Sequence, residues 1–428
     1  MSIDKTDPVQ PPVDAPAAAP DAVAAVDPRL LVREQGFAGY IGEFKRKIRA
    51  GDLGALPVVV GLFVICAIFQ SLNSAFLGVE NLNNIFVAMV ATGMMTVGII
   101  FVLLLGEIDL SVGSASGLSG AIFAVLTISH GVNEWLAIGA SLVGGALIGA
   151  LHGFFFARIG APAFAVTLAG LLFWNGFMLQ LLGANGTINI DDEGVVGKLT
   201  TYNFSDVSAA YGLAVVAVAG YFLSAFFGAR RREAAGIPSR PLSEIILRTV
   251  LLAIAVFGVA IVFNQDQGLP LAVLLFAIVL VGSDFLLRRT AYGRKIFALG
   301  GSVEASRRAG INVTAIRVSV FAIAGFFAAI GGLFWASKIA AANQSAGAGD
   351  LLMNVIAAAV IGGTSLFGGR GRTWNALLGV LVITSIQYGL ALEGIAPAIQ
   401  QMITGGVLLV TVVIDAVTRK TQKTAGRA

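Results

Sequence analysis

The sequence predicts an all-α fold, a polytopic bundle of transmembrane helices, and two properties of the whole chain predict it. Only 12% of the 428 residues are charged and their mean hydropathy is +0.87, whereas a soluble domain has about 25% charged residues. The 53 glycines fit the same class, because glycine allows helices to approach one another closely in lipid. We therefore expect the chain to cross a lipid membrane many times.

Residues 1–36 are predicted to be a disordered cytoplasmic tail. Half of the prolines lie in residues 1–33 together with alanine and aspartate, and a segment of this composition cannot bury a core. The start of the chain has no apolar stretch of the kind found in a signal peptide. Residues 37–52 carry four basic side chains between Lys45 and Arg49, so we expect an interfacial helix before the first span.

Residues 37–418 are predicted to form the transmembrane domain. Apolar stretches recur along it with the length of about 20 residues that crosses a bilayer, and we expect ten to twelve spans. The third and tenth stretches are rich in Gly and Ser, so a broken or re-entrant segment is the alternative to a complete span at these two places. The twelve stretches lie near 55–75, 85–105, 110–128, 135–157, 161–183, 208–227, 247–263, 269–287, 313–336, 351–369, 374–391 and 396–415.

The basic residues divide the connecting loops into two sets. With an even number of spans, all but two of the 28 Lys and Arg residues, Lys198 and Lys338, fall on one side. Short loops rich in Lys and Arg stay in the cytoplasm, so both chain ends, including the basic tail 419–428, are predicted to be cytoplasmic. Topology thus accounts for the net charge of +4, and no nucleic-acid partner is expected.

Residues that could carry out chemistry are scarce. The single cysteine, Cys66, lies in the first apolar stretch, and His130 and His152 are the two histidines. We therefore expect no disulfide framework, no metal site, no cofactor and no catalytic Ser/His/Asp arrangement. The phosphate-binding pattern G-x-x-x-x-G-K-[ST] does not occur, since leucine follows the one Gly-Lys pair, Gly197 and Lys198. The chain is expected to be no enzyme.

His152 is the only ionisable residue well inside a predicted span. It lies beside the series Gly145, Gly149 and Gly153, a small-residue face that favours close helix packing. We expect His152 to form a hydrogen bond to a neighbouring helix, with a role in transport as the alternative. The scarcity of buried carboxylates favours transport driven from outside the membrane over proton or sodium coupling, although backbone carbonyls alone can hold sodium.

A polar break interrupts the apolar pattern at residues 288–312. It carries six basic residues against one acid, Glu304. Its second half, Ser302 to Ala309, is predicted to be a short helix, with Gly310 in the position that commonly follows a helix. A short helix in a cytoplasmic loop can dock into a groove on another protein. The alternative is a solvated basic linker.

Three stretches resemble motifs of the ABC importer permeases. Residues 304–310, EASRRAG, resemble the EAA-x-x-x-G coupling loop, with Ser306 where the third residue is usually alanine. Residues 106–113, GEIDLSVG, and 361–369, IGGTSLFGG, resemble the sugar-importer branch of that family. The chain is similar to its ribose and xylose types, and the extra length at 208–263 favours the xylose type.

The resemblance implies a transport subunit that imports a pentose, first of all D-xylose, through the inner membrane of a bacterium. Two copies would form the path. A periplasmic sugar-binding protein would deliver the sugar at the loop 184–207, which could equally be a solvated loop. A secondary carrier acting alone and a scaffold without transport remain as alternatives. The residues that would contact a separate ATPase subunit are Glu304, Ala305, Arg307, Arg308 and Gly310.

The second motif contains an acidic turn with two interpretations. Its candidate residues are Glu107, Asp109, Ser111 and Gly113. We expect the carboxylate of Asp109 to cap the third helix, because free N–H groups and the positive end of the dipole lie there. The alternative is that the turn contacts the ATPase or gates the inner mouth of the path.

A sugar path requires hydrogen-bonding groups and aromatic faces. Within the predicted spans the candidates are Trp174 and Asn175 in the fifth stretch and Asn354 in the tenth. An amide buried in lipid is costly unless it is paired. These side chains therefore either face the path or pair with another helix.

Overall fold

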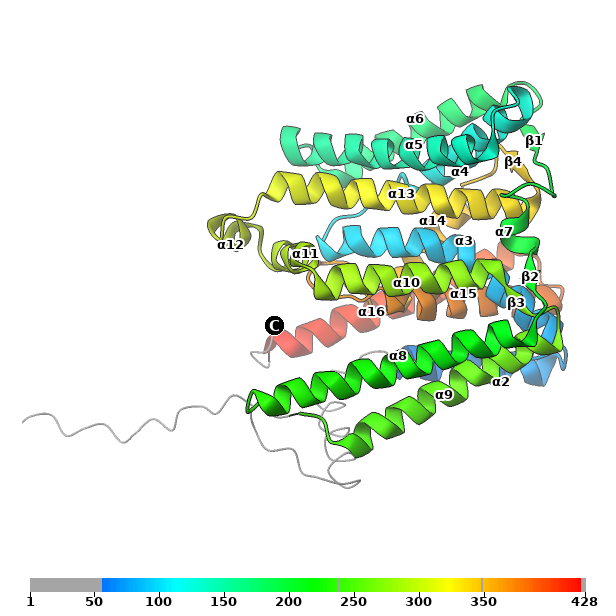
Figure 1. Ribbon diagram of the computed structural model, residues 1–428. Coiled ribbons are helices and arrows are strands. Elements are labelled where there is room, and N and C mark those ends of the chain that lie inside the picture. Colours follow the sequence, from blue (N-terminus) through cyan, green and yellow to red (C-terminus); the bar gives the residue numbers. More distant parts are fainter. Residues whose placement is uncertain (1–55, 238, 348, 425–428) are drawn as a thin grey trace, which may run out of the picture.

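The helices of the computed structural model, which describes residues 56–424 except 238 and 348, run side by side in one bundle (Figure 1). Short strands lie at one end, which we call the strand end. The other end carries α11 (Ala291–Gly301) and α12 (Val303–Arg308), and we call it the α12 end. The predicted all-α fold is confirmed. The predictions for the Pro-rich tail, the interfacial helix and residues 425–428 lie outside the described residues.

Each predicted span is occupied by a helix in the described part of the chain. Nine helical segments there are long and apolar enough to cross a membrane, judged by length and composition, and α2, α14 and the apolar part of α16 are shorter. The helices are α2 (Leu56–Leu72), α3 (Val79–Leu104), α4 (Val112–Ala124), α5 (Glu134–Phe154), α6 (Ala163–Leu182), α8 (Val207–Ala234), α9 (Leu242–Gln265), α10 (Leu271–Arg289), α13 (Val313–Ile339), α14 (Gly349–Ile361), α15 (Trp374–Leu392) and α16 (Pro397–Thr424).

One of the predicted boundaries is wrong. The tenth span was predicted to reach residue 369, but α14 ends at Ile361. Gly363, Gly368 and Gly369 have φ angles of 97°, 85° and 72°, a backbone conformation that glycine adopts readily and that a helix cannot contain. The first half of the loop 288–312, for which no secondary structure was predicted, forms α11, which buries an apolar side.

Two helices continue into a π-helical turn. These turns are η1 (Val125–Ser129) after α4 and η2 (Phe155–Ile159) after α5. In both cases the helix continues without a break to the length of a span. The third predicted span is therefore a complete helix that changes its winding near one end.

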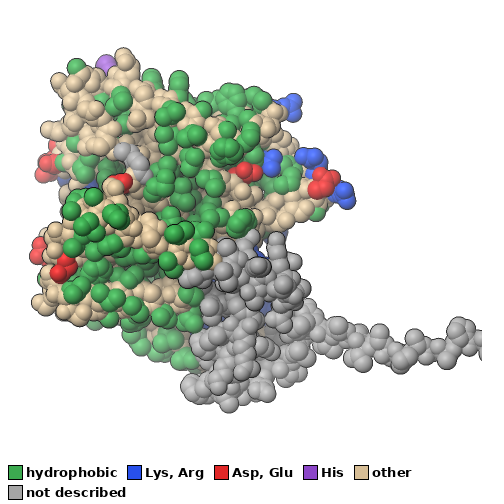
Figure 2. Space-filling view, turned by 180° about the vertical axis from the view of Figure 1, so that it is seen from behind, with side chains coloured by type: hydrophobic (Ala, Val, Ile, Leu, Met, Phe, Trp, Pro, Cys, Tyr) green, Lys and Arg blue, Asp and Glu red, His purple; other side chains and the backbone are tan. Residues whose placement is uncertain are grey.

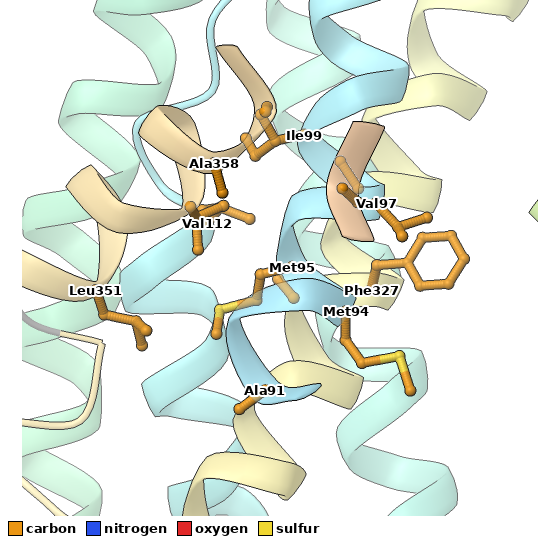
Figure 3. Packing of buried hydrophobic residues seen from close by; sticks show 14 of the residues in the cluster. Ala91, Met94, Met95, Val97, Ile99, Val112, Phe327, Leu351 and Ala358 are labelled. Atoms are coloured by element: carbon orange, nitrogen blue, oxygen red, sulfur yellow. The ribbon is translucent and has the colours of Figure 1, made fainter. Parts of the chain in front are cut away.

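The core is built around α3. In the most apolar part of this helix 94% of the residues are buried, compared with 11% in α8 and in α9. Its neighbours are α10, α13, α14 and α15. Figure 3 shows Ala91, Met94 and Met95 of α3 among the side chains of α13 and α14. The hairpin of α8 and α9, in contrast, packs mainly on itself at the edge of the bundle.

The most extensive helix contact joins α5 to α13, and glycines allow the two backbones to approach closely. A Cβ atom at Gly149 would lie 2.0 Å from the carbonyl oxygen of Phe321, and one at Gly325 would lie 2.1 Å from that of Gly145. The predicted small-residue face of α5 thus lies against the backbone of α13. Such close approach is how helices gain contact in lipid, where burial of apolar surface gives little driving force.

The strand end is held together by backbone pairing. β1 (Thr187–Asn189) pairs with β4 (Ala341–Asn343), and β2 (Asn203–Phe204) pairs with β3 (Leu269–Pro270). The one-turn helix α7 (Lys198–Thr201) lies between these strands, and its Thr200 bonds the hydroxyl of Ser337 at the end of α13. Asp191, Asp192 and Glu193 of the loop 184–207 are exposed. Figure 2 shows Lys and Arg side chains at the α12 end and apolar side chains over the middle of the visible face.

We expect Gly149→Ala to destabilise the protein. The control Gly139→Ala, in the same helix, should cause at most a slight loss of stability. The new methyl group at residue 149 meets the α13 backbone, and overpacking of this kind costs about 1–3 kcal/mol. Residue 139 has open space, and alanine favours a helix there by up to about 1 kcal/mol. The measurement is the thermal unfolding midpoint in detergent. Equal midpoints for the two variants would contradict this account of the α5–α13 contact.

Candidate functional site

The helix α12 forms because its two ends are capped by local signals. The hydroxyl of Ser302 accepts a hydrogen bond from the N–H of Ala305 at 3.2 Å. At the other end Gly310 has a φ of 77°, and the N–H groups of Gly310 and Ile311 donate to the carbonyls of Arg307 and Ser306. This pair of bonds is the Schellman motif, which favours glycine at the position of Gly310. The helix and its stop occur where the sequence predicted them.

The surface of α12 is open and charged. Glu304, Ala305, Arg307 and Arg308 are exposed, whereas Ser306 is buried against the bundle. Glu304 and Arg308 form an ion pair at 3.4 Å across one turn. In Figure 1, α12 projects beyond the ends of the long helices. The arrangement presents a short, rigid helix to whatever lies beyond that end.

Two of the stretches that resembled permease motifs, 106–113 and 361–369, meet each other and α11 at the α12 end through glycines. The backbone N–H of Gly369 donates to the carbonyl of Leu104 at 2.9 Å. A Cβ atom at Gly300, in α11, would lie 1.8 Å from the same carbonyl, and one at Gly368 would lie 2.9 Å from the N of Gly106. The end of α3, the support of α12 and the turn after α14 therefore form one packed unit.

Glu107 lies in the turn between α3 and α4 and faces Arg317 of α13. The carboxylate and the guanidinium are 3.9 Å apart, and both side chains are largely shielded from water. The Arg317 guanidinium also lies over the ring of Phe156, 4.3 Å from its centre, in a cation–π contact. Burial raises the pKa of the Glu107 carboxyl, and the positive charge of Arg317 partly offsets this effect.

Asp109 begins a chain of buried hydrogen bonds that crosses three elements. Its Oδ1 accepts from the Ser111 hydroxyl at 2.6 Å and from the Ser111 N–H at 2.8 Å. The same hydroxyl lies 3.0 Å from Nδ1 of His152 in α5. The Nε1–H of Trp174, in α6, donates to Nε2 of His152 at 3.0 Å. The chain thus joins the acidic turn to α5 and α6.

The direction of these bonds defines the form of His152. Because Trp174 can only donate, Nε2 must be the acceptor and the proton must lie on Nδ1. Nδ1–H then donates to the Ser111 hydroxyl, which donates in turn to the carboxylate of Asp109. Every member has a partner, and bonds to a charged group contribute about 1.5–3 kcal/mol each. The predicted bond of His152 to a neighbouring helix is present, with Gly170 of α6 leaving the space for its ring.

The carboxylate of Asp109 does not cap the helix α4, so this prediction is wrong. It bonds the N–H of Ser111, the residue that precedes the helix, instead of a residue inside its first turn. This is the Asx-turn arrangement. Gly113 of the same motif packs against the carbonyl of Gly347, where a Cβ atom would lie 2.5 Å away.

The structure does not bring the three candidate path residues together. Trp174 lines a groove of about 440 Å³ between α4, α5 and α6, and all of the groove's lining side chains are apolar or glycine. Asn175 is half-buried on the same helix, and Asn354 is half-buried on α14. An apolar groove offers no hydrogen bonds to a sugar. These residues therefore remain candidates on their chemistry alone.

Sequence reasoning missed the partners of the site. Neither Arg317 nor Phe156 was identified from the sequence as a partner of the acidic turn. Thr167, whose hydroxyl accepts from the N–H of Leu110 and so holds the acidic turn to α6, had no signal in the sequence. Gly170 had one signal, because a glycine inside an apolar helix usually marks a close approach.

The fold and the site define a polytopic bundle of transmembrane helices with a short exposed helix at one end. The model of the family described as "Branched-chain amino acid transport system / permease component" matches residues 81–412. The chain belongs to this permease family.

Relatives with curated descriptions cover nearly the whole chain. The xylose transport system permease protein XylH of Escherichia coli K12 is 33% identical over 374 residues, 87% of this chain and 94% of its own length. XylH of Haemophilus influenzae is 32% identical, over 87% of this chain and 99% of its own length. The ribose import permease protein RbsC of E. coli K12 is 30% identical, over 83% of this chain and 92% of its own length. No solved structure matches the chain.

The chain is thus an ABC-type sugar permease of the ribose and xylose type. Like its relatives, it is a transport subunit and is not itself an enzyme. The resemblance stated from the three motifs is confirmed at the level of the family.

We expect His152→Phe to destabilise the protein by about 1–3 kcal/mol, the cost of leaving a buried polar group without a partner. The N–H of Trp174 and the hydroxyl of Ser111 both lose a bond in this variant. The matched control is His130→Phe, which changes the other histidine, an exposed one. Thermal unfolding midpoints in detergent measure the difference. A midpoint for His152→Phe as high as that of the control would show that the chain of bonds is dispensable.

Proposed function

We propose that the protein is the permease subunit of an ATP-driven importer that carries a pentose, D-xylose in the first place, across the inner membrane of a bacterium. The exposed helix α12, held rigidly by its caps, is the observation that carries the proposal. Its surface residues Glu304, Ala305, Arg307 and Arg308, with Gly310 behind them, are the proposed contacts to an ATPase subunit. The chain itself has no phosphate-binding loop, so the motor is a partner.

The α12 end is proposed to be cytoplasmic. The support is the distribution of charge: of the described Lys and Arg residues only Lys198 and Lys338 lie near the strand end, and short basic loops stay on the inner side. Both chain ends would then be cytoplasmic. The exposed acidic residues of the loop 184–207 would face the periplasm, where a sugar-binding protein is the proposed partner.

Two copies are proposed to form the path. The resemblance to importer permeases supports this, and so does the character of the groove beside Trp174, whose apolar lining does not suit a sugar. A path between two copies would draw its polar lining from side chains that one copy leaves half-buried, among them Asn175 and Asn354.

The choice of D-xylose over D-ribose has two supports. The XylH proteins are 33% and 32% identical to the chain, and RbsC of E. coli K12 is 30% identical. The hairpin of α8 and α9 is the extra length that favoured the xylose type. Because this hairpin lies outside the core, its presence says nothing about the sugar by contact, and ribose stays the alternative.

The test of the function is purification of the tagged full chain in mild detergent, followed by transfer of the recovered complex to liposomes. We expect a subunit with a G-x-x-x-x-G-K-[ST] loop to accompany the permease. Uptake of D-xylose should require ATP and the binding protein. Uptake by the permease alone, without ATP, would instead identify a secondary carrier, and a chain that neither transports nor retains a nucleotide-binding subunit would be a scaffold.

Charge reversal in α12 tests the coupling contact. Glu304→Arg removes the ion pair with Arg308 and places a positive charge in the docking surface, so we expect ATP-dependent uptake to fall at least about tenfold, a loss of about 1.4 kcal/mol of binding. The control is Glu233→Arg, an exposed glutamate near the end of α8. The measurement is uptake together with the amount of ATPase subunit recovered with the permease. Full uptake in Glu304→Arg would refute the contact.

Competition for uptake tests the sugar. Unlabelled D-xylose should displace labelled D-xylose at about a tenth of the concentration that D-ribose requires, which corresponds to about 1.4 kcal/mol of preference. The measurement is the concentration of each sugar that halves uptake in the same vesicles. Stronger competition by D-ribose would make this a ribose permease.

A further inference from the structure

The turn between α3 and α4 is bonded to two separate parts of the bundle. On one side the carboxylate of Glu107 faces the guanidinium of Arg317 in α13. On the other side Asp109 is joined through Ser111 to His152 in α5 and through His152 to Trp174 in α6. Polar contacts through this one turn therefore connect α13 with the pair of helices α5 and α6.

A displacement of α12 would reach Arg317 before any other charged residue of α13. Only Ala309 to Asn312 separate α12 from α13, and Arg317 is the first charged residue of α13. Arg307 of α12 lies close enough to Arg317 to repel it. A shift of α12 would thus change both the position of Arg317 and the charge around it.

The two sides of the turn differ in how firmly they are held. The bonds from Asp109 to Ser111 and from Ser111 to His152 are 2.6–3.0 Å long, and all three residues are at most 4% exposed. The Glu107–Arg317 pair is 3.9 Å apart, within range of charge attraction but beyond a hydrogen bond. The turn is therefore fixed to α5 and meets α13 through a contact that can tighten or open.

We propose that Glu107 and Asp109 are positioning residues for the transport step, and that the α3–α4 turn passes a displacement of α12 and α13 to α5 and α6. The inference rests on the proposed function, in which an ATPase moves α12. A shift of Arg317 moves Glu107 and with it the turn. The bonds that join Asp109 to Ser111 and His152 then move α5 and α6. Neither carboxylate touches the sugar.

The test measures D-xylose uptake and ATP hydrolysis in the same liposomes, which contain the complete complex, with D-ribose as the second sugar. The variants are Glu107→Gln, Arg317→Gln, Arg317→Lys and the exchange of Glu107→Arg with Arg317→Glu. The control is Arg240→Gln, which removes another long contact of an arginine, 3.7 Å from Glu244, away from the turn.

We expect the sugar carried per ATP hydrolysed to fall about fivefold in Glu107→Gln and Arg317→Gln, the lower end of typical coupling between sites, while ATP hydrolysis continues. Arg317→Lys and the exchange variant should recover most of the ratio, because each restores the pair of charges. Arg240→Gln should match the wild type. A ratio in the two neutral variants equal to the control would overturn the proposal, and so would a parallel loss of hydrolysis and uptake that the exchange does not repair.

A second pair of variants tests the branch through His152. Ser111→Ala removes the hydroxyl between Asp109 and His152, and we expect the same fall in the ratio. The matched control is Ser141→Ala, because the Ser141 hydroxyl is equally buried and bonds only the Ala137 carbonyl of its own helix. An unchanged ratio in Ser111→Ala would overturn the role of Asp109. Failure of the wild-type complex to import either sugar would instead refute the proposed function, and with it this inference.

Discussion

Contact between the backbones of α5 and α13 is the interaction on which the rest of the structure depends. It requires glycine, since a Cβ atom at Gly149 would lie 2.0 Å from the Phe321 carbonyl oxygen. Bilayer lipid is as apolar as the helix surfaces, so it is this fit of surfaces and not burial that holds the two helices together. His152 follows Gly149 by three residues, and Arg317 precedes Phe321 by one helical turn. The contact therefore fixes where His152 and Arg317, the two partners of the α3–α4 turn, lie along their helices.

Polar side chains in the bundle show two ways of meeting the demand for hydrogen bonds in an environment without water. Ser114, Ser116 and Ser119 of α4 are buried, and each donates to a carbonyl within its own helix or at its start. They leave α4 free of polar ties, so its small face serves close packing. The hydroxyl of Ser111 instead bonds two side chains, Asp109 of the same turn and His152 of α5. For this reason the turn before α4, and not the face of α4, connects the helices.

The sequence was informative wherever the determining interactions are local. Spans follow from the apolar character of about 20 consecutive residues, and the end of α12 follows from Gly310 and its neighbours. The end of α14 could not be located in this way, because Leu366 and Phe367 extend the apolar stretch beyond the glycines that stop the helix. In α11 the charged residues Arg294 and Lys295 stand next to each other, so the sequence did not reveal the apolar side that this helix buries. Sequence reasoning indicated that His152 needed a partner, but which one depends on how α5 and α6 pack, and the pairing of Glu107 with Arg317 depends on the whole bundle.

The two ends of α13 are held by different kinds of contact, and this bears on the kind of movement that α13 can make. At the strand end Ser337 bonds Thr200 and the carbonyl of Gly197, and β4 follows directly in a paired sheet. At the α12 end α13 begins after a four-residue connection, and its polar contacts there are between side chains: the long ion pair to Glu107 and the hydrogen bond between Ser319 and Tyr292 of α11. A helix fixed at one end and displaced at the other tilts, and does not slide along its axis. Alternating access needs a movement that changes one mouth of a path more than the other, and a tilt of α13 about Ser337 has this property.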